Sequence, residues 1–122
     1  MDIDELAKAI AYEVEAYIEE VQDNLDAAAD LYAKELAADI KEDSPVRSGN
    51  YKKGWRVQKK GHTRTVYNKN RPDLTYVLEY GCTRRDGSRI TPTPHIRDNA
   101  DRACENFEDL CVNIVAEGVR II

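Results

Sequence analysis

The stretch Ser44-Pro45-Val46-Arg47-Ser48-Gly49-Asn50-Tyr51 divides this chain of 122 residues into two parts of different character. Before it, the sequence is acidic and its apolar residues have helical spacing. After it, the sequence is basic and rich in Gly, Pro, Tyr and β-branched residues. Pro45 disfavours helical backbone at Ser44 and cannot continue a helix, so we expect the preceding helix to end here. Gly49-Asn50 then predicts a turn.

The apolar residues before this stretch recur with a period of about 3.6 residues. The spacing predicts one straight amphipathic helix from about Asp4 to about Glu42, roughly 55–60 Å long at 1.5 Å per residue. A domain of this size cannot cover such a helix, so part of its apolar stripe should find another partner. A break near Asp23-Asn24, giving two packed helices, is the alternative. The stripe comprises Ile3, Leu6, Ile10, Val14, Ile18, Val21, Leu25, Ala28, Tyr32, Leu36 and Ile40.

The segment that follows has the pattern of short strands and turns. Residues 51–60 and 63–68 predict a hairpin with its turn at Gly61-His62, and Trp55 is expected to anchor it to the core. Residues 69–74 indicate a loop, whereas the pattern of residues 76–80 fits either a strand or a helical turn. Residues 83–88 predict an exposed loop or hairpin tip, because they contain an Asp-Gly turn signal.

The end of the chain returns to helical periodicity. Residues 89–93 could form an edge strand, because Pro92 and Pro94 bar a central position. Residues from Ile96 to about Glu117 predict a second helix. We therefore expect an α+β fold with a long N-terminal helix, a small antiparallel sheet of three or four strands, and a C-terminal helix packed on the sheet. Residues 1–122 should form a single domain of three segments, 1–43, 44–95 and 96–122.

The net charge of −5 conceals a strong segregation of charge. Residues 1–46 carry 3 basic and 14 acidic side chains, residues 47–97 carry 13 and 3, and residues 98–122 carry 2 and 6. Residues 47–71 alone hold nine Lys or Arg and no acid, interleaved with Tyr and Trp, as on a nucleic-acid-binding face. A solvated strand surface, a match to the chain's own acidic helices, or a contact between copies in a head-to-tail ring would give the same pattern.

Several protein classes lack support in the sequence. No apolar run approaches the roughly 20 residues of a membrane span, and the N-terminus does not resemble a signal peptide, so we expect a soluble protein made in the cytosol. Cys82, Cys104 and Cys111 contain no C-x-x-C pair and should be reduced. A zinc site with His62 or His95 is conceivable, but no ligands have the usual short spacing. The P-loop, zinc-protease and nucleophile-elbow motifs are absent, so we expect no cofactor and no enzymatic activity.

Several blocks of residues together resemble the minor tail-component family of long-tailed double-stranded DNA phages, the gene-ten-like head-tail connector or neck family. The resemblance covers about residues 40–105, and no single block would suffice. Ser48, where the family often has Thr, and the long N-terminal helix are departures from it. The blocks are Ser44–Tyr51, Gly54-Trp55-Arg56-Val57, Tyr76-Val77-Leu78-Glu79-Tyr80-Gly81, the Arg-rich Asp86-Gly87 loop, and Pro92-Thr93-Pro94-His95-Ile96.

The resemblance implies a non-enzymatic virion protein at the head-tail junction or the top of the tail, made in the host cytoplasm. It would form a ring with copies of itself, bind other connector and tail proteins, and let genomic DNA pass without sequence-specific contact. Intersubunit or channel contacts are expected from Arg47, Lys52, Lys53, Arg56, Lys59, Lys60, Arg64, Arg84, Arg85 and Arg89. A structural joint is expected from Pro45, Gly49, Trp55, Glu79, Gly81 and Pro94.

Particular roles and alternatives follow for these residues. Glu79 could be a buried acceptor for Arg47 or for the backbone N–H groups of the turn, or it could be a surface residue. His95 should be structural and lie near the start of the last helix. The loop of residues 84–89 could reach a neighbour or the channel, or simply be solvated. An independent DNA-binding protein that uses residues 47–71 is one alternative function, and a small enzyme built on Glu79, His95 and Cys82 is another.

Overall fold

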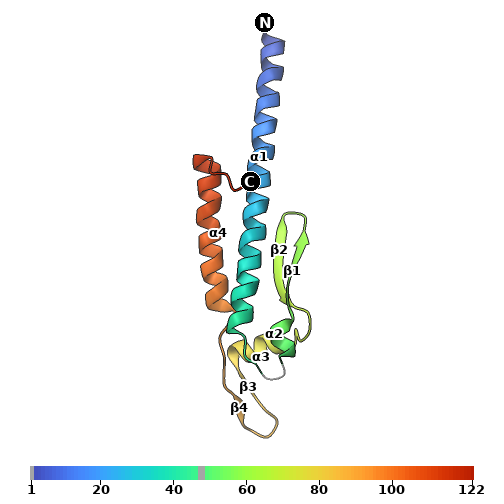
Figure 1. Ribbon diagram of the computed structural model, residues 1–122, viewed down its shortest axis with the longest axis vertical. Helices are drawn as coiled ribbons and strands as arrows, with labels where there is room; N and C mark the ends of the chain where they lie inside the picture. Colours follow the sequence, from blue (N-terminus) through green and yellow to red (C-terminus); the bar gives the residue numbers. More distant parts are fainter. Residues whose placement is uncertain (1, 47–48) are drawn as a thin grey trace.

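The computed structural model describes residues 2–46 and 49–122. Helix α1 is the axis of the molecule, and both α4 and the β1–β2 hairpin pack along it (Figure 1). Helices α2 and α3 and the β3–β4 hairpin lie at the end away from the N-terminus (Figure 1). The predicted α+β class is confirmed. The elements are α1 (Ile3–Asp43), α2 (Asn50–Lys53), β1 (Trp55–Lys60), β2 (Thr63–Asn68), α3 (Leu74–Tyr80), β3 (Cys82–Thr83), β4 (Arg89–Ile90) and α4 (Arg97–Glu117).

The long N-terminal helix is confirmed and it is unbroken. Its 41 residues include neither Gly nor Pro, and Asp2 caps its start by accepting the N–H of Glu5 at 2.8 Å. The helix ends where Pro45 requires it to, because Ser44 takes an extended conformation with φ −68° and ψ 140°. The alternative of a break near Asp23-Asn24 is therefore wrong.

The first part of α1, which we call the arm (residues 2–19), contacts α4 at its base, where the Tyr17 hydroxyl donates to the carbonyl of Val115 at 3.5 Å. Every residue of the arm is exposed, and it extends alone beyond α4 and the β1–β2 hairpin (Figure 1). The tail after α4 (residues 118–122) contacts α1 just beyond the arm, where Arg120 pairs with Glu20 at 2.5 Å and the N–H of Ile121 donates to Asn24 at 2.9 Å. Part of the apolar stripe thus has no partner among the residues described.

The hairpin after the Pro45 stretch is confirmed, although it begins later than the sequence suggests. Strands β1 and β2 pair antiparallel from Trp55 opposite Asn68 to Lys60 opposite Thr63, with a two-residue turn between them. Residues 51–53 belong to the short helix α2 and not to the strand. Gly49 precedes α2 in a left-handed conformation, with φ +81°, and the chain turns there into the helix.

The remaining strands form a second, separate pair. Residues 76–80, which fitted either a strand or a helix, are helical as part of α3. Helix α3 lies between β2 and β3 in the chain, and β3 pairs only with β4, so the structure has two two-stranded sheets and not one sheet. A hairpin is too narrow to cover a helix of 21 residues, and the principal partner of α4 is therefore α1.

The core lies where α1 ends and β1 begins. Ile40, Tyr51 and Trp55 are buried together, and Trp55 is the anchor that the sequence predicts. The indole N–H of Trp55 donates to Ser44 Oγ at 2.8 Å, while Ser44 Oγ donates to the carbonyl of Ile40 at 2.6 Å. Ser44 is thus buried and links the end of α1 to the start of the β1–β2 hairpin.

Gly81→Ala should destabilise the fold more than Gly87→Ala. Gly81 has φ +77° and ψ 170°, a conformation almost confined to glycine, and a Cβ there would lie 2.6 Å from the carbonyl oxygen of Ile90. Gly87 also has positive φ, at +88°, but a Cβ there meets nothing within 4 Å. We expect losses in the free energy of unfolding of about 3 kcal/mol and about 1 kcal/mol respectively. Urea unfolding checks this, and equal losses would show that the Ile90 carbonyl imposes no constraint.

Candidate functional site

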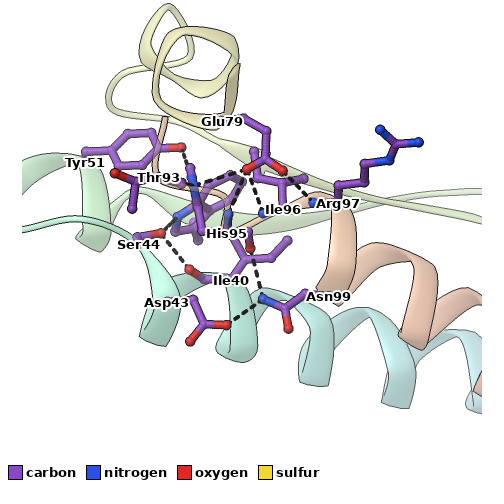
Figure 2. A network of polar contacts seen from close by, with 11 residues as sticks. Ile40, Asp43, Ser44, Tyr51, Glu79, Thr93, His95, Ile96, Arg97 and Asn99 are labelled. Atoms are coloured by element: carbon purple, nitrogen blue, oxygen red, sulfur yellow. Dashed lines mark hydrogen bonds and ion pairs between the residues drawn. The ribbon is translucent and has the colours of Figure 1, made fainter. Parts of the chain in front are cut away.

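A buried carboxylate ties the start of α4 to the end of α3 (Figure 2). Glu79 is only 5% exposed and accepts the backbone N–H groups of His95 at 2.8 Å, Ile96 at 3.0 Å and Arg97 at 2.9 Å. Ile96 provides no side-chain cap for α4. Glu79 therefore satisfies the free N–H groups of this helix from another element, and its negative charge lies at the positive end of the helix dipole.

His95 joins this carboxylate to the core. Its ring is buried, with Nδ1 2.7 Å from the carbonyl oxygen of Thr93 and Nε2 2.7 Å from the hydroxyl of Tyr51 (Figure 2). A carbonyl can only accept, so Nδ1 carries a proton, and this nitrogen also lies 3.3 Å from Oε2 of Glu79. His95 is thus structural and lies beside the start of the last helix, as the sequence predicts.

The surroundings of the cluster fix the charge of its members. Burial alone would raise the pKa of Glu79, but the backbone N–H groups of His95, Arg97 and Ile96 outweigh it and hold that pKa below its ordinary value. Burial, followed by the nearby charge of Glu79, raises the pKa of Tyr51 to about 12. At neutral pH the cluster therefore holds an anionic Glu79 and a neutral Tyr51.

Two buried asparagines complete the connection between segments. Asn99 of α4 donates to Asp43 at 2.8 Å and to the carbonyl of His95 at 2.9 Å (Figure 2). Asn68, at the end of β2, donates to the carbonyl of Tyr51 at 2.7 Å. The Glu79, His95 and Tyr51 groups are thus engaged in hydrogen bonds that connect separate segments of the chain.

The partners of Glu79 differ from those that the sequence suggests. Glu79 is a buried acceptor of backbone N–H groups, but these belong to residues 95–97 and not to the turn before α2. Arg47, the other suggested partner, lies outside the described residues. Pro45 and Pro94 directly adjoin the buried Ser44 and His95. Sequence reasoning missed the buried polar roles of Ser44, Tyr51, Asn68 and Asn99, because no periodicity separates them from surface polar residues.

The predicted basic contact residues are distributed over three regions. Lys52 and Lys53 lie on α2, Arg56, Lys59, Lys60 and Arg64 on the β1–β2 hairpin, and Arg84, Arg85 and Arg89 on the β3–β4 hairpin. The β1–β2 turn lies beside the middle of α1, whereas the β3–β4 hairpin is at the far end of the molecule (Figure 1). The residues therefore do not form one continuous site.

Part of this positive charge is matched by α1 of the same chain. Arg64 has a side chain only 4% exposed and pairs with Asp30, and His62 Nδ1 lies 2.9 Å from Asp26. These two contacts hold the pKa values of both aspartates below their ordinary range. Lys52 and Arg56 donate to backbone carbonyls of Glu42, Lys53 and Trp55.

The rest of the positive charge remains available. Within residues 2–46 and 49–122, no ion pair involves Lys53, Lys60, Arg84, Arg85 or Arg89. All five side chains are exposed. These residues can therefore meet an external negative partner without first breaking an ion pair.

In the part of the chain that the structure describes, no three His, Cys, Asp or Glu side chains come close enough together to hold a metal ion. The same residues include no helix that is long and apolar enough to cross a membrane.

Glu79→Gln should lower the free energy of unfolding by about 2–4 kcal/mol at pH 7, because an amide loses the charge that strengthens three buried hydrogen bonds. Since the pKa of Glu79 is lowered on folding, its stabilisation is present above the ordinary value of 4.5 and is lost as the pH falls through the lower folded value. The gap between wild type and variant should shrink at acid pH. Urea unfolding at several pH values measures it.

The exposed Glu105 of α4 offers a matched control. Glu105→Gln should change the free energy of unfolding by less than about 0.5 kcal/mol. A Glu79→Gln variant as stable as this control would show that the carboxylate does not support the joint.

Comparison with known proteins places the chain in a family. The family described as "Bacteriophage HK97-gp10, putative tail-component" matches residues 7–81, more than half of the chain. No curated protein and no solved structure matches it. The matched range contains most of α1, so the long helix lies largely within the family region. The blocks after residue 81 lie outside that range.

The blocks around Pro45, Trp55 and Glu79 therefore fall within a match to an established family, in agreement with the resemblance seen in the sequence. The chain belongs to the HK97-gp10-like family of bacteriophage tail components.

Proposed function

We propose that this protein is a structural virion component of the head-tail junction, a neck or tail-completion connector, whose copies form a ring around the DNA channel. Residues 1–122 act as one connector domain. Family membership supports a place among the tail components. The observation that carries the ring is the separation of exposed, unlike charges along one elongated subunit.

The exposed charges are on different parts of the molecule. The arm carries six acidic side chains and one Lys, whereas Lys53, Lys60 and the Arg residues of the β3–β4 hairpin provide exposed positive charge. A long subunit cannot bring its own arm to these basic surfaces, but a neighbour can. Contact between two different surfaces of identical chains is heterologous, and a suitable rotation between copies closes it into a ring.

The β3–β4 hairpin fits a second role within the same assembly. Arg84, Arg85 and Arg89 are exposed at the far end of the molecule. Arginines that meet phosphates without reading base edges bind DNA independently of its sequence. This hairpin is suited to contact the genome in the channel or the adjoining connector and tail proteins of the virion.

The double variant Lys53→Glu/Lys60→Glu should weaken self-association by about tenfold, because it replaces attraction to the acidic arm with repulsion. Lys34→Glu/Lys41→Glu makes the same change in net charge on exposed positions of α1 and is the matched control. Light scattering over a concentration series measures association, and electron microscopy of the purified protein shows whether rings form. Equal association of both variants, or a strictly monomeric wild type, would contradict the proposal.

The outer face of the β1–β2 hairpin supports an alternative function as an independent DNA-binding protein. Arg56, Lys60 and the partly exposed Tyr67 are on alternate positions of the paired strands and share that face. Fluorescence anisotropy with duplex DNA should then show an affinity that falls steeply with salt. Negligible binding at low salt would remove this alternative and leave the connector role standing.

A further inference from the structure

A groove of about 780 Å³ lies between α1, β2 and α4. Its lining is predominantly apolar, and the side chains around it include Val66 and Phe107. Small residues of both helices also line it, so a third helix could approach closely. These small residues are Ala29 and Ala33 of α1 and Ala100 and Ala103 of α4.

The arm offers an apolar surface of matching character. Ile3, Leu6, Ile10, Val14 and Ile18 recur with helical spacing and are between 49% and 84% exposed. Apolar residues at such spacing are the anchors by which an amphipathic helix binds in a hydrophobic groove. A contiguous exposed apolar stripe of this kind marks a surface that is covered by a partner.

The arm of a subunit cannot fill the groove of the same subunit. Helix α1 is continuous from Ile3 to Asp43 without Gly or Pro, and the groove is built on its second half. Folding the arm back onto the groove would require a sharp break, which such a sequence does not provide. The occupant must therefore come from another molecule.

Charge selects a second copy of the chain as the occupant. The arm is strongly acidic, and the β1–β2 hairpin beside the groove carries no acidic residue. Arg64 lines the groove, and its buried Nη2 has no hydrogen-bond partner in the part of the chain described. A carboxylate from an incoming arm would supply an acceptor for a guanidinium that the subunit leaves incompletely satisfied.

We propose that the groove of each subunit receives the arm of a neighbouring copy. This docking rests on the proposed connector function and specifies the contact between copies in the ring. The apolar stripe of one arm lies against the groove of the next subunit, and its acidic flanks face the basic hairpin. Donor and acceptor surfaces differ, so the contact propagates from copy to copy.

Cross-linking tests the position of the arm directly. Cys104 is exposed and lines the groove, so a cysteine on a docked arm can form a disulfide with it. In a Cys82→Ser/Cys111→Ser background, Cys is introduced singly at Leu6, Ile10, Val14 or Tyr12, and the full-length protein is oxidised mildly. At least one stripe position should yield several-fold more linked dimer than Tyr12→Cys, because Tyr12 is about 200° around the helix from Ile10. Cys104→Ser should abolish the link.

Self-association provides the second readout. Ile10→Asp should weaken association by roughly tenfold or more, because it places a charge at a buried contact, while Tyr12→Asp should change it little. Both positions are exposed in the subunit, so circular dichroism should show an unchanged fold.

The possible results distinguish failure of the arm docking from failure of the ring. If Ile10→Asp assembles as the wild type does and no arm cysteine links to Cys104, the docking is overturned and the ring stands. A discrete two-fold dimer with the expected link supports the docking and removes the ring. A wild-type chain that stays monomeric overturns both.

Discussion

A single helix without a break sets the geometry of this protein. Forty-one residues with neither Gly nor Pro form a rod of roughly 60 Å, and the rest of the chain is enough to cover only its second half. The hairpin and α4 pack on that half, while the arm remains exposed. The apolar stripe of α1 continues past the elements that cover it, and this exposed length is the basis of the proposed contact between copies.

At the other end of α1, hydrogen bonds connect several segments of the chain. Glu79 collects three N–H groups at the start of α4, and Asn99 connects the same turn to Asp43 at the end of α1. Ser44 connects that end of α1 to Trp55 at the start of the hairpin. Four chain segments therefore meet in one buried polar cluster, and their relative orientation is set by hydrogen bonds as well as by apolar packing.

Local signals in the sequence predict much of this fold. The 3.6-residue spacing predicts both long helices, Pro45 predicts the end of α1, and Gly61-His62 predicts the two-residue turn of the hairpin. The same signals fail where tertiary contacts decide. Residues 51–53 are helical, and Tyr51 is buried against Trp55 and His95. The contact between Tyr51 and His95 joins residues that are 44 positions apart in the sequence. Likewise, nothing local shows that the strands form two separate pairs.

The candidate site, too, could be predicted from the sequence only in part. The resemblance and the composition of the chain identify Glu79 and the basic residues. They do not show which groups Glu79 binds or which positive charges α1 neutralises. Arg64 and Lys60 look alike in the sequence, yet the Arg64 side chain is buried against Asp30 and Lys60 is exposed. Lys60 pairs with Thr63, the residue before Arg64 on β2, and successive residues of a strand face opposite sides of the sheet. Sequence alone gives the identity of such charges without their orientation.

The exposed arm also bears on how strongly subunits hold one another. The turns of the arm that precede Tyr17 have no hydrogen bond to another described element, so in the proposed assembly they can fray before the arm docks. Frayed turns must be ordered when the arm is taken up, and this entropic cost offsets part of the attraction between subunits. In the proposed assembly this cost weakens each contact of the arm, so a misplaced subunit can dissociate until several neighbours hold it at once.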